Sequence, residues 1–237
     1  VRIPKRADHL DERAFIQWEN GYLEERYRFL DSLNLDTHFV RIERQRLYAL
    51  HELALCYYPM THRYQVDNYE PSVDYLTYLS GIIREDSTLL NLQEYRDAMA
   101  LLVKTISIQS IDPSDLLLMT KTQLDWIDKH LKDHKVGEFL VYQLVVAYVS
   151  EKGIDHFSEI SPVYECWVKS GSYRQAFDEL YARWDKIACG REIPEIELLN
   201  VEGEIVKLTD FKGKYIYIDV WGSTCPPCRK ELLFLKV

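Results

Sequence analysis

Residues 219–231 read Asp219-Val-Trp-Gly-Ser-Thr-Cys225-Pro-Pro-Cys228-Arg-Lys-Glu231, and this stretch decides the fold of the C-terminal part. The run before it, Tyr215-Ile-Tyr-Ile218, alternates aromatic and β-branched residues, which is typical of a strand. The Cys-Pro-Pro-Cys sequence then opens an amphipathic segment, residues 229–235. The order predicts a strand, a short turn and a helix that carries a Cys-x-x-Cys pair at its start.

That position predicts reactive thiols. Cys225 falls at or next to the N-cap, where free backbone N–H groups and the positive end of the helix dipole favour an anion. A thiol pKa is lowered there, and the thiolate is the reactive form. Cys228 follows three residues later and shares a helix face with Cys225. One thiol can therefore attack a disulfide, and the other can resolve the mixed disulfide that results.

Two carboxylates lie close to the cysteines in the sequence. Asp219 interrupts an otherwise apolar strand pattern, where a charge is costly unless it has a task or a partner. Glu231 follows Cys228 by three residues, roughly one helical turn. Either side chain can exchange the proton of Cys228 during turnover. The alternative reading, which stays open, makes Glu231 a solvated helix residue and Asp219 a strand-end cap.

The same residues carry a resemblance to a known family. Segments 193–198, 203–214 and 221–232 resemble the opening of a thioredoxin-fold protein of the ResA/TlpA type, related to the AhpC/TSA group. The resemblance implies that Cys225 is the nucleophile and Cys228 the resolving thiol. It also implies that Asp219 is the buried acid of thioredoxins and that Glu231 is the active-site glutamate of the ResA branch. Thr224 departs from the pattern, because most relatives have Trp there.

The resemblance covers about a fifth of the chain and sets further expectations. A complete thioredoxin fold has more strands and helices, including a cis-proline loop that faces the cysteines. We therefore expect residues 190–237 to be the N-terminal part of a thioredoxin-like domain, truncated at its C-terminal side. ResA/TlpA-like proteins act outside the bacterial cytoplasmic membrane, so we expect the periplasm or cell envelope. The implied partners are protein thiols or disulfides and a membrane-linked electron donor; no cofactor is implied.

Composition excludes some classes of function. The 237 residues are 47% hydrophobic and 28% charged, with a net charge of −9, which is typical of a soluble globular chain. An acidic surface argues against nucleic acid as a partner. The sequence contains no run of about 18 apolar residues, so it predicts no membrane span. The chain begins with Val1, and no signal peptide is visible. Five cysteines are too few for a dense disulfide framework.

Residues 6–189 have helical periodicity throughout, and capping residues and prolines indicate where the helices start and stop. The spacing predicts helices over about 8–33 (capped by Asp8), 37–58 (ended by Pro59), 72–83 (capped by Ser72), 89–107, 112–131 (Pro113 at its first position), 136–149 (central and buried, before Gly153), 157–168 and 173–188.

Short strand patterns replace the helical ones after residue 189. Residues 195–199 and 205–208 flank Glu202-Gly203, which predicts a hairpin. The predicted fold is thus mainly α. An all-helical domain of about eight helices, residues 1–189, is followed by the first strands and active-site helix of a thioredoxin-like α/β domain, residues 190–237. We expect unpaired strand edges in this second part to pack on the helical domain or on a second copy of the chain.

Two patterns in the sequence have part of the spacing of a metal site. His130 and His134 have the spacing of two ligands on one helix, but no third ligand is evident. Cys225 and Cys228 could supply half of a zinc site, but the sequence has no second Cys-x-x-Cys. We expect neither a metal nor a cofactor.

Two functions from different classes remain. In the first, the protein is a thiol–disulfide oxidoreductase that acts on exported proteins through the Cys225–Cys228 dithiol. In the second, residues 1–189 are a protein-binding module and the thioredoxin-like part is a non-catalytic remnant. Removing Cys225 abolishes activity in the first case and leaves partner binding intact in the second. The sequence favours the first.

Overall fold

A computed structural model of the chain describes residues 7, 9–109 and 111–234. The internal contacts divide the chain after Gly190 into two units, and each is described by itself. We refer to them as the helical unit and the C-terminal unit. The prediction of a mainly α fold with a partial thioredoxin-like region is confirmed.

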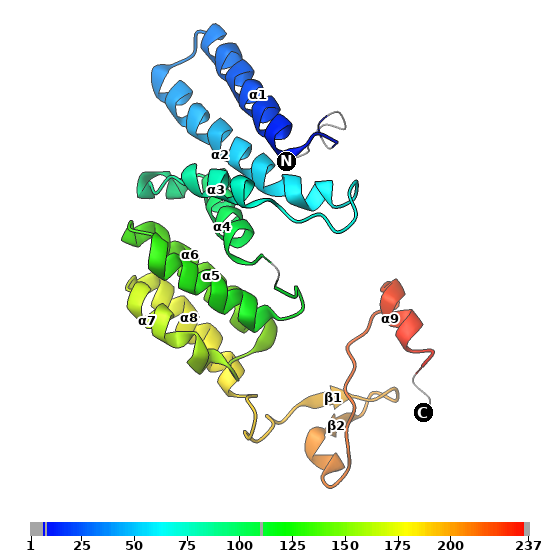
Figure 1. Ribbon diagram of the computed structural model, residues 1–237. Coiled ribbons are helices and arrows are strands. Elements are labelled where there is room, and N and C mark those ends of the chain that lie inside the picture. Colours follow the sequence, from blue (N-terminus) through cyan, green and yellow to red (C-terminus); the bar gives the residue numbers. More distant parts are fainter. Residues whose placement is uncertain (1–6, 8, 110, 235–237) are drawn as a thin grey trace. The chain divides into compact units, whose positions relative to one another are not determined.

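The described residues of the helical unit form eight α-helices and two short 3-10 helices (Figure 1). They are α1 (Glu12–Ser32), α2 (Thr37–His62), α3 (Val73–Gly81), η1 (Ser87–Asn91), α4 (Gln93–Ser107), α5 (Leu116–His130), α6 (His134–Lys152), η2 (Phe157–Glu159), α7 (Ser161–Trp167) and α8 (Gly171–Asp185).

The most extensive helix contact joins α2 to α4, and most of the others join helices that follow one another in the sequence. The principal contacts join α1 to α2, α2 and α3 to α4, α4 to α5, α5 to α6, and α6 to both α7 and α8. One cluster of buried residues includes side chains from all eight of these helices. Its largest fully buried side chains include Tyr58, Tyr95, Leu102 and Leu140. None of the described helices is apolar over a length that would cross a bilayer.

Asp and Ser caps explain most helix starts. Ser72 caps α3 as predicted, because its hydroxyl accepts a hydrogen bond from the Tyr75 N–H at 3.1 Å. Two other predicted starts differ. Asp8 lies outside the described residues, and α1 is capped by Asp11 instead. The predicted start at Asp112 is wrong: its carboxylate accepts hydrogen bonds from Ser114 in a turn, and Asp115 caps α5.

Pro59 does not end α2, contrary to the sequence-based expectation. The helix continues to His62, with Pro59 buried inside it. A proline lacks the N–H that would bond the carbonyl four residues earlier, here that of Leu55. The Tyr75 hydroxyl donates to the Leu55 carbonyl at 2.6 Å and so replaces the missing donor. A side chain from α3 therefore makes the proline tolerable.

The predicted central helix is α6, and most of one face is buried. Gly153 ends it in a left-handed conformation (φ 75°), which side chains rarely adopt. Gly137 has a different role, since a Cβ atom there would overlap the Trp167 ring. The close approach of α6 and α7 therefore depends on glycine at this position.

The C-terminal unit holds a short hairpin and a short helix within its described residues. Strands β1 (Glu197–Leu199) and β2 (Ile205–Lys207) pair antiparallel, with Leu198 opposite Val206. The 3-10 helix η3 (Leu208–Phe211) follows directly, and α9 spans Pro226–Glu231. The hairpin prediction is confirmed, while the predicted helical segment 229–235 extends partly outside the described residues.

The predicted strand at residues 215–218 is not formed. These residues have no regular structure, and Tyr217 is 75% exposed. A strand exists only when another strand pairs with its backbone groups, and no described segment pairs with this one. The alternating pattern is present, but local sequence alone cannot supply the partner.

Candidate active site

Cys225 and Cys228 lie at the start of α9 and form a disulfide, with Cα atoms 5.4 Å apart. Cys225 is the N-cap residue of α9, and the backbone N–H of Cys228 donates to its Sγ at 3.3 Å. Both residues are half-buried, so each sulfur lies near the surface. The arrangement is a redox-capable pair in which one sulfur already accepts a backbone hydrogen bond.

The local sequence accounts for this geometry. The Cys225 N–H donates to the Gly222 carbonyl at 3.0 Å, which closes the turn before the helix. Pro226 and Pro227 occupy the first turn of α9, where a missing N–H costs nothing. The first helical bond runs from the Arg229 N–H to the Cys225 carbonyl at 3.1 Å. Turn and helix together fix the separation of the two sulfurs.

The two predicted carboxylates lie at the surface. Asp219 is exposed on the extended segment before the turn, and Glu231 is exposed at the last position of α9. Within the described residues, no side-chain hydrogen bond or ion pair joins either carboxylate to another group. The burial that the resemblance implies for Asp219 is therefore not present here, and the proton-transfer roles of both residues stay predictions.

The other three cysteines are free. Cys56 is buried in α2, and burial raises the pKa of its thiol to about 12. Such a thiol is almost entirely protonated near neutral pH and unreactive. Cys166 and Cys189 are exposed. Any assay of the dithiol must therefore remove these two thiols first.

His130 and His134, whose spacing is that of two metal ligands on one helix, lie on different helices. His130 stacks on Trp126 in the last turn of α5, and His134 stacks on Trp167 from the first turn of α6. A search of the described residues finds no group of three or more His, Cys, Asp or Glu side chains placed to hold a metal ion.

Comparison with known proteins bears on the same stretch. Residues 189–236 match the AhpC/TSA family. Over 56 residues the chain is 34% identical to the thiol-disulfide oxidoreductase ResA of Bacillus cereus, which covers 24% of this chain and 32% of that protein. The C-terminal segment is ResA-like. ResA of Bacillus subtilis is 30% identical to it over 59 residues, which are 25% of this chain and 33% of that protein.

The ResA-like segment is short. ResA of Geobacillus thermodenitrificans matches over 50 residues at 35% identity, 21% of this chain and 29% of the relative. The chain therefore spans about a third of the length of the curated relatives it matches. No solved structure matches the chain significantly.

Proposed function

We propose that this protein is a thiol–disulfide oxidoreductase and that the Cys225–Cys228 pair is its redox centre. The observation that carries the proposal is the disulfide at the start of α9, inside the segment that is similar to ResA. The hydrogen bond from the Cys228 N–H favours a thiolate on Cys225 over one on Cys228 when the pair is reduced. This asymmetry supports Cys225 as the nucleophile.

The reaction balances in two steps. The Cys225 thiolate attacks one sulfur of a substrate disulfide; a Cys225–substrate disulfide forms, and the other substrate sulfur leaves as a thiolate and takes up a proton. The Cys228 thiolate then attacks the Cys225 sulfur, and the second substrate thiolate leaves and is protonated. Two electrons and two protons pass from the dithiol to the substrate. The same steps in reverse oxidise a substrate dithiol.

The remaining roles follow from the resemblance. Asp219 or Glu231 exchanges the Cys228 proton, since both carboxylates are open to solvent at the two ends of the turn–helix element. The substrates are thiols or disulfides of exported proteins in the periplasm or cell envelope. A membrane-linked donor supplies or removes electrons.

The exposed, unpaired run at residues 215–218 is a second surface, able to pair with another strand in the full assembly.

The first test is the reduction potential of the couple. A Cys166→Ser/Cys189→Ser variant leaves the dithiol as the accessible thiol pair, because Cys56 is buried and unreactive. The variant is equilibrated with glutathione buffers, alkylated and weighed by mass spectrometry. We expect a reversible two-electron couple. A potential of roughly −270 mV indicates a reductase, and one of roughly −120 mV indicates an oxidant of thiols.

The second test assigns the two sulfurs. Cys228→Ser, in the same background, should accumulate a stable mixed disulfide between Cys225 and glutathione, because no thiol remains to resolve it. The matched control is Cys225→Ser, in which Cys228 is the remaining thiol of the pair and should form its own mixed disulfide with glutathione more slowly. Equal rates would contradict the assignment of Cys225 as nucleophile. Failure of the pair to form a reversible disulfide in the first test would refute the proposed function altogether.

A further inference from the structure

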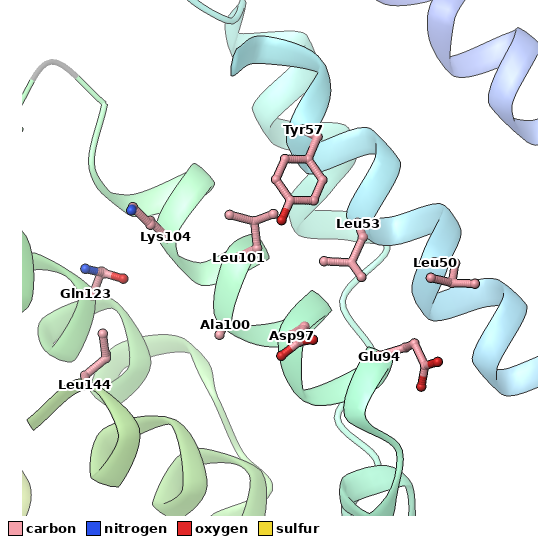
Figure 2. A pocket seen from close by; sticks show the side chains of 10 residues that line it. All are labelled: Leu50, Leu53, Tyr57, Glu94, Asp97, Ala100, Leu101, Lys104, Gln123 and Leu144. Carbon is pink, nitrogen blue, oxygen red and sulfur yellow. The ribbon is translucent and has the colours of Figure 1, made fainter. Parts of the chain in front are cut away.

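A groove runs along α4 on the surface of the helical unit and has a volume of about 510 Å³. Figure 2 shows the side chains that line it, which come from α2, α4, α5 and α6. Its apolar wall is formed by Leu50, Leu53, Tyr57 and Leu101. We call this feature the α4 groove; it lies outside the C-terminal unit and does not involve the dithiol.

The α4 groove is deepened by a small residue. Ala100 lies on α4 in the middle of the groove and is exposed, and its methyl group leaves open the space that a larger side chain would fill. A second hollow of about 220 Å³ adjoins the groove and shares Ala100, Gln123 and Leu144 with it. The second hollow reaches buried Ile127 and Leu140. The two adjoining hollows therefore offer apolar side chains more than one place to enter.

One end of the groove is acidic. Glu94 and Asp97 project from the first two turns of α4. Glu94 contacts Arg46 at 3.3 Å, but this guanidinium is shared with Glu43 at 2.5 Å. Asp97 accepts a hydrogen bond from the neutral Gln93 amide at 2.6 Å and has no cationic partner within the described residues. Glu43 and Glu94 therefore share Arg46, and Asp97 has no cation in the described part of the chain, which leaves this end of the groove with excess negative charge that a ligand can meet.

The other end of the groove is basic. Lys104 lies in the last turn of α4 and is exposed, and no carboxylate among the described residues pairs with it. Lys104 follows Glu94 by ten residues, which corresponds to about 15 Å along a helix axis. An extended peptide covers that distance in about five residues at roughly 3.3 Å each. The two ends therefore match opposite charges on a short extended segment.

Neutral polar groups between the ends favour an extended ligand over a helical one. The Tyr57 hydroxyl has no hydrogen-bond partner among the described residues. Gln123 donates its amide to the Met119 carbonyl at 3.1 Å, which leaves its own carbonyl oxygen as an acceptor. Exposed Gln143 lines the adjoining hollow. An extended backbone has free N–H and C=O groups to meet such side chains, whereas a helix has already paired its own.

We propose that the α4 groove binds an extended polypeptide segment. Apolar side chains at alternate positions of that segment enter the groove and the hollow beyond it. A basic residue of the segment meets Glu94 and Asp97 at one end, and an acidic residue meets Lys104 at the other. The helical unit thereby selects unfolded or exposed protein segments by their alternating apolar pattern and their opposite terminal charges.

The test uses capped, fluorescein-labelled hexapeptides and fluorescence anisotropy with the full chain. The matching peptide is Arg-Leu-Ser-Leu-Ser-Glu, and the mismatched one is Glu-Leu-Ser-Leu-Ser-Glu. Reversing the peptide's charges is not a valid control, because an extended chain can bind in either direction. We expect the matching peptide to bind about fivefold more tightly, and Asp97→Lys to abolish or invert this preference. An unchanged preference in Asp97→Lys would overturn the charge assignment and the proposal with it.

A steric variant tests the location. Ala100→Phe should weaken binding of the matching peptide by at least about tenfold, because the ring fills the groove. Ala182→Phe is the matched control, since Ala182 is an exposed alanine on α8 and should leave binding unchanged. Far-UV circular dichroism and the urea midpoint verify that both variants fold. Equal effects of the two variants refute the proposal. The proposal is also refuted if the extended peptide does not bind and the groove has another occupant. That occupant would be a twelve-residue helical peptide, or a second copy of the chain seen as self-association in sedimentation, and Ala100→Phe would abolish its binding.

Discussion

Glu52 is the buried acid whose protonation should set how the stability of the helical unit depends on pH. It lies in α2 with 0% of its surface exposed, and its Oε1 has no hydrogen-bond partner. Its Oε2 accepts from Arg84 at 3.4 Å, but that guanidinium also binds Gln45 at 2.5 Å and lies 3.8 Å from the centre of the Tyr48 ring. Arg84 is therefore a weak and divided partner.

Burial raises the pKa of the Glu52 carboxyl from its ordinary 4.5 to about 7, and the attraction of Arg84 opposes this only in part. Between these two values the folded state holds a proton that the unfolded state has released. The free energy of unfolding therefore falls as pH rises from 4.5 to about 7, and the contribution of Glu52 is fully present only below 4.5. The shift corresponds to about 3 kcal/mol.

Glu52→Gln removes the titration and keeps the shape of the side chain. We expect the difference in unfolding free energy, variant minus wild type, to rise by about 3 kcal/mol between pH 4.5 and about pH 8. Urea denaturation followed by far-UV circular dichroism measures it. Glu25→Gln, at an exposed position of α1, controls for the loss of a charge as such. A difference that stays flat or falls with pH would show that Arg84 keeps the carboxylate ionised in the folded state.

Three further predictions concern backbone and packing. Gly137→Ala should destabilise the helical unit by about 1–3 kcal/mol, because the new Cβ atom overlaps the Trp167 ring. Gly21→Ala, in a helix position with nothing within 4 Å, should stabilise it by about 0.5–1 kcal/mol. Tyr75→Phe should lower the free energy of unfolding by about 1–3 kcal/mol, because it leaves the Leu55 carbonyl without a donor. In a Pro59→Ala background the same substitution should cost less than about 1 kcal/mol, because residue 59 then supplies a backbone N–H. Urea titration checks all of these, and equal costs of Tyr75→Phe in both backgrounds would contradict the donor-replacement argument.

The sequence predicts local structure well where the signal is local. Ser72 and Gly153 mark helix ends because one side chain or one backbone conformation is sufficient there. The hairpin between residues 197 and 207 is predicted for the same reason, since Gly203 permits the turn at φ 83°. These features need no knowledge of distant residues.

One miss is local, because Asp112 and Asp115 are both able to cap a helix and only Asp115 caps α5. The other misses depend on distant residues. Nothing near Pro59 indicates that Tyr75 will supply the donor that the proline lacks. The run at residues 215–218 has a strand pattern but no pairing partner among the described residues. The α4 groove is also invisible in the sequence, because its residues come from four helices and have ordinary core spacing. A small exposed residue such as Ala100 between larger apolar ones is a signal only once the packing is known.

The dithiol and the α4 groove lie in different units, so their roles can be separated by experiment. Ala100→Phe should block the matching peptide and leave the reduction potential of the Cys225–Cys228 couple unchanged. Cys225→Ser should abolish the couple and leave peptide affinity unchanged. A protein that both holds an extended segment and exchanges its disulfide should act faster on a matching peptide that carries a disulfide than on a mismatched one. That advantage should disappear in Ala100→Phe, whereas reaction with glutathione should not. If Ala100→Phe slows the reactions with the peptide and with glutathione equally, the substitution affects the reactivity of the dithiol, and the groove does not capture the substrate.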